Sequence, residues 1–439
     1  MYLTAGFVFD DFDDARNRFA GVDPGYIYSR YANPTVAAVE QRIAALEHGA
    51  DAILVGSGQA AISSALLGLL RAGDHVVSAS SIYEGSRALF LENFPALDIE
   101  STFVEDANDP AEWERRIRPN TRALFAESIS NPRNRILDVA AIADVARRHG
   151  IPLVIDNTFA SPYLLRPIEH GADIVVHSAS KFLSGHGTVL GGVIVDGGRF
   201  DWGAHPDRFS QLTHPGIDGG PGFLERFGRT AYSAYTRSVI VSRLGPTASP
   251  FTAFLIQQGI ETLSLRLDRQ SATALALARW LEGRPEVSSV DYAGLASHPH
   301  YELARRYLPR GQGSVFAVTL RGGVAAAKAL INAVGLFTHM AHLGDVRSLI
   351  QHPASTSHAH RTDAQLRYEG IGPGMIRLSV GVEDAADLIA DLERGLAAIP
   401  RSFDIEAAFS GTNSPPDGAV AAGLSAGPLV TVSTRTTER

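Results

Sequence analysis

One lysine draws attention because this chain uses so few of them. Lysine and arginine together number 39, but only two are lysine, Lys181 in the segment HSASKFLSGHG and Lys328. Arginine supplies surface charge equally well, but its guanidinium stays protonated and cannot condense with a carbonyl as an amine does. Lys181 follows the apolar run ADIVV, so it is predicted just beyond a strand end, where α/β proteins bind ligands. Imine chemistry is one reason to keep a lysine here, and an ordinary surface lysine is the alternative.

A carboxylate is predicted at the same edge of the sheet. The apolar run in IPLVIDNTFASPY ends in Asp156, 25 residues before Lys181. Two neighbouring strands would then bring an acid and an amine to one place. An enzyme that uses pyridoxal phosphate needs this pair, because the lysine holds the aldehyde and the acid keeps the pyridine nitrogen protonated. Taken alone, Asp156 could equally end a strand in a turn or cap a helix.

A phosphate group needs donors, and the sequence offers a candidate cradle. The segment VGSGQAAISSALLGLL places a Gly-Ser-Gly motif, which ends at Gly58, between a predicted strand and a predicted helix. Backbone N–H groups at a helix N-terminus bind phosphate well. Ser178 and Ser180 flank Lys181 and could add hydroxyl donors. Any tight strand-to-helix turn has a similar pattern, so this motif depends on Lys181 and Asp156 for its interpretation.

The elements that would position these residues follow an alternating pattern. Between residues 50 and 200, short apolar runs such as AILVG and GGVIVDGG alternate with amphipathic segments such as DVAAIADVARRHG. This pattern is typical of an α/β fold, a mainly parallel sheet flanked by helices. We predict a large domain over 46–245, a smaller α+β domain over 246–400, and a flexible tail over 401–439, which is poor in charge.

Composition limits the partners and the compartment. The formal net charge is −8, which argues against nucleic acid or an anionic membrane as a partner. The chain has no cysteine, so disulfides, thiolate metal sites and cysteine nucleophiles are excluded. This composition fits a reducing cytoplasm, and we expect neither a signal peptide nor a transmembrane helix.

Longer motifs resemble a known enzyme family. They are SRYANPTVAAVEQRIAALE, SGQAA, VIDNTFASPYLLRPIEHGADIVVHSASKFLSGHGTVLGGVIVDGG, HPASTSH and IRLSVGVED. In this order they look like the Cys/Met-metabolism family of pyridoxal phosphate enzymes, over about residues 2 to 400. Segments such as GHGTVLGGVIVDGGRFDW are closest to its O-acetylhomoserine sulfhydrylase branch. The resemblance implies the fold-type-I transferase-like architecture, with a smaller C-terminal domain.

The resemblance also implies roles for single residues. Lys181 matches the lysine that binds the cofactor as a Schiff base, and Asp156 matches the partner of the pyridinium. Tyr83 matches a tyrosine that stacks on the ring and assists proton transfer. The other matches to cofactor-binding positions are Gly58, Gln59, Ser178 and Ser180 around the phosphate, and Asn131 near the ring hydroxyl.

Subunit contacts and substrate contacts are implied in the same way. Tyr28 and Arg30 match residues that reach the phosphate of a neighbouring subunit, which implies a homotetramer built as a dimer of dimers. Residues 1–45 would then be an N-terminal arm and interface segment. The matches to substrate-binding positions are Arg377, which clamps the carboxylate, and Ser348 and His342 nearby.

The activity that the resemblance implies is γ-substitution on O-acetylhomoserine. Sulfide, or a thiol, would replace acetate and give homocysteine or a homologue. Two departures from the family pattern bear on this. Glu84 stands where glycine is common and could repel an anionic nucleophile, and His342 stands where asparagine or serine is common. A γ-lyase, or a cystathionine γ-synthase-like enzyme with another nucleophile or ester, is the alternative.

Three hypotheses that assign the chain to another class of protein have weaker support. Ser178–Lys181 fits the S-x-x-K motif of serine acyl-enzymes, but its companions S-D-N and K-T-G are absent from the sequence. His358 and His360 could suggest a metal, but no H-E-x-x-H pattern accompanies them. A non-catalytic binding protein on the same fold is expected to lose Lys181 or Asp156, and both are present.

Overall fold

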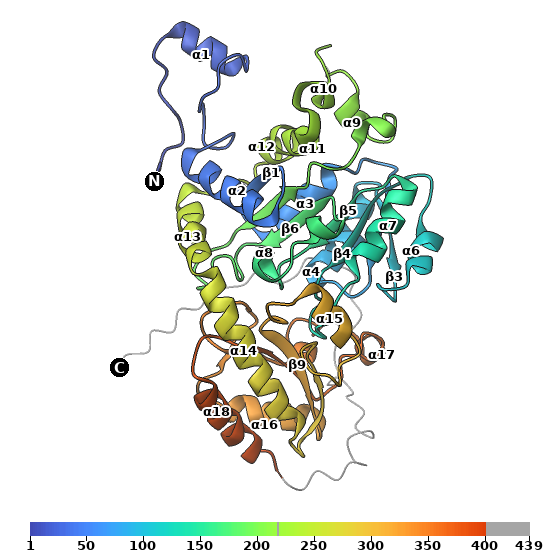
Figure 1. Cartoon of the computed structure of the whole chain (residues 1–439), viewed down its shortest axis with the longest axis vertical. Coiled ribbons are helices and arrows are strands. Elements are labelled where there is room, and N and C mark those ends of the chain that lie inside the picture. The colour runs from blue at the N-terminus through green and yellow to red at the C-terminus, as the bar shows by residue number, and fades with distance from the viewer. Residues whose placement is uncertain (217–218, 401–439) are drawn as a thin grey trace, which may run out of the picture. The chain divides into compact units, whose positions relative to one another are not determined.

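The computed structural model describes residues 1–216 and 219–400, and these build two β-sheets with helices around them (Figure 1). The first sheet has seven strands in the order β1-β7-β6-β5-β4-β2-β3. The strands are β1 Asp51–Val55, β2 His75–Ala79, β3 Glu100–Val104, β4 Thr121–Glu127, β5 Leu153–Asp156, β6 Ile174–Ser178 and β7 Gly192–Asp196. Neighbours from β3 to β6 are parallel, whereas β7 runs antiparallel to both β1 and β6.

Helices flank this first sheet because its central strands are apolar on both faces. Val154, Val175 and Ile194 are fully buried, so each face needs a covering layer. Helices α2 and α3 pack against β1 and β7, and α7 packs against β5. The helices in this part are α1 Phe12–Phe19, α2 Pro34–Glu47, α3 Gly58–Leu67, α4 Glu84–Ala88, α5 Phe94–Ala96, α6 Pro110–Arg116, α7 Val139–His149, α8 Ser161–Leu164, α9 Ser210–Thr213, α10 Phe223–Phe227, α11 Ala231–Tyr235 and α12 Ser242–Leu244.

Local sequence signals explain where two of these helices begin. The side chain of Asn33 accepts a hydrogen bond from the main chain of Thr35, and Pro34 occupies the first turn of α2. Ser57 caps α3 in the same way, because its hydroxyl accepts a hydrogen bond from the N–H of Ala60 at 3.1 Å. The second cap lies at the start of the predicted phosphate cradle.

The second sheet is smaller and mainly antiparallel. Its order is β10-β11-β12-β9-β8, with only β10 and β11 parallel. The strands are β8 Val287–Asp291, β9 Val315–Leu320, β10 Thr338–His339, β11 Leu349–Gln351 and β12 Met375–Ser379. The remaining helices are α13 Pro250–Glu261, α14 Leu263–Glu282, α15 Tyr301–Tyr307, α16 Gly323–Ala333, α17 Asp363–Tyr368 and α18 Ala385–Ala397.

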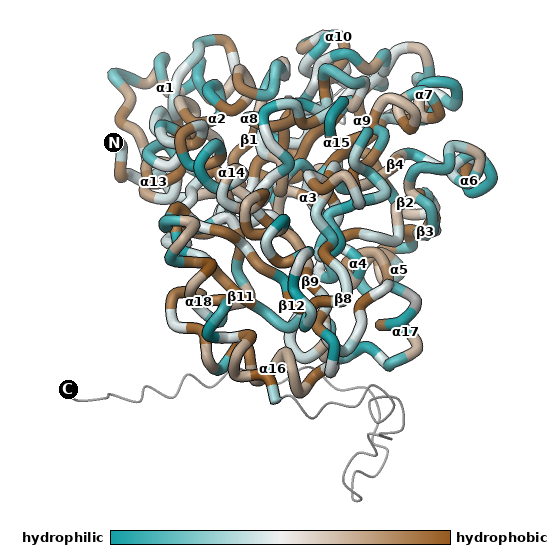
Figure 2. Tube along the Cα trace, turned by 60° about the horizontal axis from the view of Figure 1, so that its bottom comes forward, coloured by the Kyte–Doolittle hydropathy of each residue, from teal (hydrophilic) through white to brown (hydrophobic). Residues whose placement is uncertain are grey.

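Each sheet has its own buried apolar core. The second core is formed by α14, α16, α18 and the strands they cover. Colouring by hydropathy shows brown along interior strands such as β11 and teal along the peripheral helices α6 and α17 (Figure 2). The predicted α/β architecture, a mainly parallel sheet flanked by helices with a smaller second sheet, is confirmed.

The predicted domain bounds stay predictions, and the described residues up to 400 belong to one compact unit by their contacts. Helix α13 packs on α2 beside the first sheet, whereas α14 follows and covers β8. The predicted tail, 401–439, lies outside the described residues. Within the described ranges, no helix is long and apolar enough to cross a membrane, and no group of three or more potential ligands could hold a metal ion.

A buried carboxylate on α18 holds the loop that leads into β10. Asp391 is 1% exposed and accepts hydrogen bonds from three consecutive main-chain N–H groups, those of Gly335, Leu336 and Phe337. Replacing Asp391 with Ala leaves these donors buried without an acceptor. We expect the free energy of unfolding to fall by about 3 kcal/mol, measured by urea denaturation.

The matched control is Asp387→Ala, because Asp387 lies on the same helix and is exposed. Its effect should stay within about 0.5 kcal/mol. Equal effects of the two substitutions would contradict a structural role for the Asp391 carboxylate.

Candidate active site

The predicted acid and amine emerge from neighbouring strands of the first sheet. Asp156 is the last residue of β5 and pairs in register with Val176 of β6. Lys181 follows the end of β6 after a short turn, in which its own N–H bonds to the carbonyl of Ser178. Because β5 and β6 are parallel, both residues lie at the carboxyl edge of the sheet.

Asp156 is held by a threonine that also reaches the next strand. Its carboxylate accepts hydrogen bonds from the N–H of Thr158 at 3.0 Å and from the Thr158 hydroxyl at 2.5 Å. The same hydroxyl accepts a hydrogen bond from the N–H of Ser178 at 2.8 Å. Burial raises the pKa of Asp156, and the Thr158 hydrogen bonds and the nearby His177 oppose that rise.

A second buried carboxyl group stands beside Asp156, and sequence reasoning missed it. Glu127 ends β4 and is in register with Asp156. Burial, followed by the charge of Asp156, raises the pKa of Glu127 well above its usual range. Its Oε1 accepts a hydrogen bond from the N–H of Tyr83 at 2.6 Å. A signal for Glu127 existed, since the segment RALFAES contains an apolar run, ALFA, that is followed directly by this acid.

The predicted phosphate cradle brings the start of α3 against the end of β6. A Cβ atom added to Gly58 would lie 2.6 Å from the Cβ of Ser178 and 2.8 Å from its Oγ. Glycine is therefore required for this close approach, and the hydroxyl of Ser178 lies at the helix N-terminus. Ser180 differs, because its Oγ accepts from the N–H of Gly191 at 2.9 Å and donates to that residue's carbonyl at 3.2 Å. It holds the lysine loop to the segment before β7.

Tyr83 and Gln59 lie together above this cradle. A Cβ atom added to Gly85 would lie 2.5 Å from the Tyr83 ring and 3.2 Å from the Gln59 side-chain nitrogen. The Tyr83 side chain is 46% exposed, and its main chain is anchored by Glu127. The structure therefore brings both predicted residues together beside Gly85, and Tyr83 is open to solvent.

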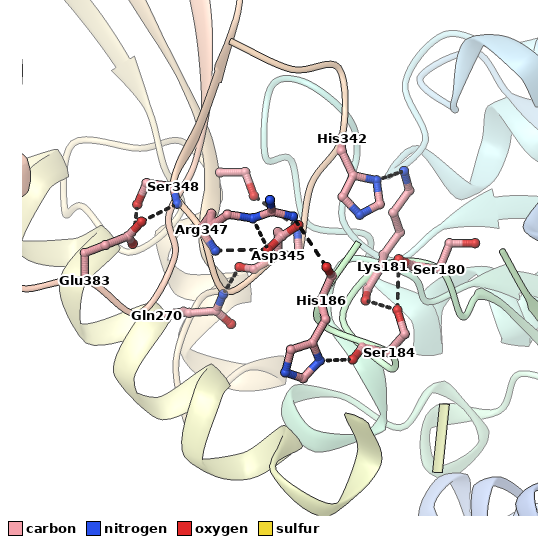
Figure 3. Close-up of polar contacts among 12 residues, drawn as sticks. Ser180, Lys181, Ser184, His186, Gln270, His342, Asp345, Arg347, Ser348 and Glu383 are labelled. Carbon is pink, nitrogen blue, oxygen red and sulfur yellow. Dashed lines mark hydrogen bonds and ion pairs between the residues drawn. The ribbon is translucent and has the colours of Figure 1, made fainter. Parts of the chain in front are cut away.

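Lys181 meets residues from the second sheet (Figure 3). Its Nζ lies 3.0 Å from Nδ1 of His342. Burial lowers the pKa of Lys181 to about 8, and the charge of Arg377 acts in the same direction. Arg377 donates to the carbonyl of His342 at 2.9 Å and to the Asn131 side chain at 3.2 Å. Three predicted residues and the lysine thus form one connected group.

Ser348 and Arg30 are bonded elsewhere. The Ser348 hydroxyl donates to Glu383 at 2.8 Å and accepts from the N–H of Gly381 at 2.9 Å, so its substrate contact stays a prediction (Figure 3). Arg30 donates to the carbonyl of Ser242 at 2.7 Å, and its guanidinium lies over the rings of Tyr28 and Tyr31. The contact of Tyr28 and Arg30 with a neighbouring subunit also stays a prediction.

Glu84 does not present an isolated charge. Its carboxylate pairs with Arg361 at 2.7 Å, and Arg361 also lies 3.7 Å from Glu369. Because Arg361 is largely buried, solvent screens its attraction to Glu84 only weakly, and the one guanidinium is shared between Glu84 and Glu369. The expected repulsion of an anionic nucleophile by Glu84 is therefore reduced.

A further buried network lies behind the site. Glu47, at the end of α2, accepts hydrogen bonds from the side chain of Asn157 at 3.0 Å, and its Oε1 lies 2.6 Å from Nε2 of His177. Asn157 follows Asp156 and His177 precedes Ser178, so one carboxylate ties together the ends of β5 and β6. Sequence reasoning missed it because these contacts span more than 100 residues.

This network should be sensitive to the loss of its acceptor. Glu47→Ala leaves Nε2 of the buried His177 without its partner and removes one of the two acceptors of the Asn157 amide, which still donates to the Leu165 carbonyl, so we expect the free energy of unfolding to fall by about 3 kcal/mol. Glu47→Gln keeps an oxygen of the same shape and should lose less than half as much. Urea denaturation measures both, and a loss below about 1 kcal/mol for Glu47→Ala would contradict the role.

Comparison with known proteins matches this chain to one family along nearly its whole length. The model of the Cys/Met metabolism PLP-dependent enzymes matches residues 1–397. Homocysteine synthase of Schizosaccharomyces pombe is 44% identical over 90% of this chain and 92% of its own length. O-acetyl-L-homoserine sulfhydrylase of Corynebacterium glutamicum is 42% identical over 91% of this chain and 92% of its own.

A solved structure gives the same result. The putative O-acetylhomoserine (thiol)-lyase of Campylobacter jejuni superposes with a TM-score of 0.86 at 35% identity, over 90% of this chain and 94% of that one. It carries a pyridoxyl-lysine monophosphate. This chain therefore belongs to the Cys/Met metabolism family of pyridoxal phosphate-dependent enzymes.

Proposed function

We propose that this enzyme catalyses γ-substitution on O-acetylhomoserine, in which sulfide or a small thiol replaces acetate and homocysteine or a homologue forms. One observation carries the proposal. A lysine amine with a pKa of about 8 lies in the same connected group as a buried arginine, Arg377, which can hold an amino-acid carboxylate. The names of the relatives support the choice of substrate.

The residues present fit pyridoxal phosphate. Asp156 is a buried carboxylate that a protonated pyridine nitrogen would neutralise. The N-terminus of α3, with Gly58, Gln59 and Ser178, offers donors to a phosphate. Tyr83 would face the ring and Asn131 would lie near its hydroxyl, while Ser180 shapes the lysine loop. When bound, the cofactor withdraws electrons from Cα of the substrate and so makes its protons removable.

Lys181 is suited to carry protons. A pKa of about 8 leaves part of the amine unprotonated near neutral pH, so the same group can take a proton from Cα and return one to the carbon chain. Its position between β6 and the second sheet keeps it in contact with His342 at the edge of the site. Overall, the acetate leaves Cγ with its bonding electrons and the sulfur nucleophile forms the new bond there.

Arg377 is suited to bind the substrate carboxylate. Its side chain is buried, two of its N–H groups are used by Asn131 and His342, and its Nε has no partner among the described residues. Burial lowers its pKa to about 10, which still leaves it cationic at neutral pH. A carboxylate that accepts from Nε would pair with this charge and orient Cα toward Lys181.

The charge near Glu84 bears on the nucleophile. Glu84 lines a cavity of about 100 Å³ together with Asn131 and His358, among others. Because Arg361 pairs with Glu84, the repulsion of an anionic nucleophile such as sulfide by this carboxylate is reduced.

The enzyme is also proposed to be a cytoplasmic homotetramer, a dimer of dimers in which Tyr28 and Arg30 complete the neighbouring site. Residues 1–45 would form the arm between subunits, followed by the large domain to 245 and the smaller domain to 400. The apolar side chains of Val8, Phe12 and Phe19 support the arm, since they are 90%, 81% and 67% exposed. The absence of cysteine supports the cytoplasm.

The activity is tested by product analysis. Purified, cofactor-loaded enzyme is supplied with O-acetylhomoserine with and without sulfide. We expect homocysteine and acetate in equal amounts, and only when sulfide is present, because the nucleophile captures the intermediate at Cγ. Lys181→Ala, which removes the proton carrier, is the control and should form none. Formation of 2-oxobutyrate and ammonia regardless of sulfide would instead identify a γ-lyase.

Substitution of the exposed phenylalanines tests whether the proposed arm, residues 1–45, lies in a subunit interface. The double substitution Phe12→Asp with Phe19→Asp should weaken self-association on the order of 100-fold, because it removes two apolar contacts from the interface. Sedimentation over a concentration series measures this. The control is Leu265→Asp, because Leu265 is 71% exposed and lies on another helix, α14. An unchanged association constant for the double variant would contradict the arm.

A further inference from the structure

A second cavity adjoins the one that Glu84 and Asn131 line. Its volume is about 400 Å³, and its walls come from the segments that follow β3 and β4 and from the segment between β8 and α15. It shares Glu105, Arg133 and Arg135 with the cavity at Asn131. None of the residues assigned above to the cofactor or the substrate lines it. We call this space the outer cavity.

Buried contacts with the second sheet hold the walls of the outer cavity in place. Asn134, between the two arginines, is 1% exposed; its amide donates to the carbonyl of Val315 at 2.8 Å, and its side-chain oxygen accepts from the N–H of Ala293 at 2.8 Å. On another wall, Nδ1 of His300 donates to the carbonyl of Ile136 at 2.9 Å. The cavity is therefore fixed by packed parts of the fold.

The cationic side of the outer cavity has free donors. Among the residues that the structure describes, the guanidinium of Arg135 has no hydrogen bond or ion pair. The Nε of Arg133 is buried without a partner, and its terminal nitrogen lies 3.4 Å from the carboxylate of Asp291. Burial, followed by the charge of Arg133, lowers the pKa of Arg135. An anionic group beside both arginines would relieve this repulsion and accept their hydrogen bonds.

The anionic side has free acceptors. Within the described ranges, the carboxylate of Glu105 has no hydrogen bond or ion pair, because only its main-chain N–H is bonded. The carboxylate of Asp106 accepts from the N–H of Asn108 at 3.0 Å and has no cationic partner. Two arginines thus face three carboxylates, with Asp291 as the third, and the charges nearly cancel. A ligand that carries one charge of each sign complements such a surface, whereas a simple anion meets the carboxylates.

We propose that the outer cavity is a second binding site, which takes a free zwitterionic α-amino acid. The guanidinium of Arg135 binds the carboxylate of the ligand, and Glu105 and Asp106 bind its ammonium group. Because the outer cavity adjoins the cavity at Asn131, an amino acid bound here lies next to the active site, before reaction as substrate or after it as product. This use rests on the proposed function, but the binding itself does not.

The test measures binding without turnover. The full-length, cofactor-loaded enzyme is reduced with borohydride, and L-norleucine is titrated into it while saturation-transfer NMR records the bound fraction. We expect Arg135→Ala to weaken binding about 10-fold, because a hydrogen bond between charged groups is lost. The double substitution Glu105→Gln with Asp106→Asn should weaken it about as much from the opposite side of the cavity. Arg279→Ala, at an exposed arginine on α14, is the control and should leave binding unchanged.

Two analogues test the zwitterion in the unaltered sequence. Hexanoate lacks the amine of norleucine and pentylamine lacks its carboxylate, so each should bind about 10-fold more weakly than norleucine. Equal binding of hexanoate would identify a simple anion site and overturn the proposal. This comparison needs no variant, so it decides even if a substituted chain does not fold.

Arg377→Ala separates the outer cavity from the active site. The proposal expects norleucine to bind this reduced variant as it binds the unaltered protein. Binding that is lost in Arg377→Ala but kept in Arg135→Ala would place the ligand in the active site and overturn the proposal, as would no binding up to about 10 mM. No step uses O-acetylhomoserine or sulfide, so failure of the proposed activity is distinguished from failure of this site.

Discussion

The site depends on one side-chain link between two parallel strands. The Thr158 hydroxyl donates to Asp156 at the end of β5 and accepts from the N–H of Ser178 at the end of β6. This link sets the carboxylate against the strand that leads into Lys181. On the opposite side of the strands, Glu47 holds the adjacent residues, Asn157 and His177. The ends of β5 and β6 are therefore held from two directions, and this fixes the positions of Asp156 and of the segment that leads into Lys181.

The second sheet completes the site by supplying charge. Burial, followed by the charge of Arg377, lowers the pKa of Lys181, and Nδ1 of His342 lies 3.0 Å from its Nζ, so residues far along the chain surround the lysine amine. Burial has opposite effects on the two sides of the site. It makes Asp156 easier to protonate and Lys181 easier to deprotonate. A cofactor that supplies a cationic nitrogen and takes up the amine suits both tendencies.

The sequence predicted the fold and the strand-end chemistry because both depend on local patterns. Apolar runs that end in Asp156, or lead into Lys181, place these residues at a sheet edge without knowledge of any partner. The hydrogen-bond partners were not predictable in that way. Ser348 is bonded to Glu383 and Arg30 to Ser242, and neither pairing has a local signal. The sequence patterns were also not used to find Glu127, although the apolar run that ends at Glu127 resembles the run that ends at Asp156.

The central claim is that Lys181 provides the amine that holds the cofactor, and the rarity of lysine makes it directly testable. Cofactor-loaded enzyme is reduced with borohydride, digested and mapped by mass spectrometry. The only two lysine side chains are Lys181 and Lys328, so the location of the pyridoxyl group is unambiguous. The account predicts the label on the peptide that contains Lys181. A label on Lys328, or no label on protein that had bound the cofactor, would contradict it.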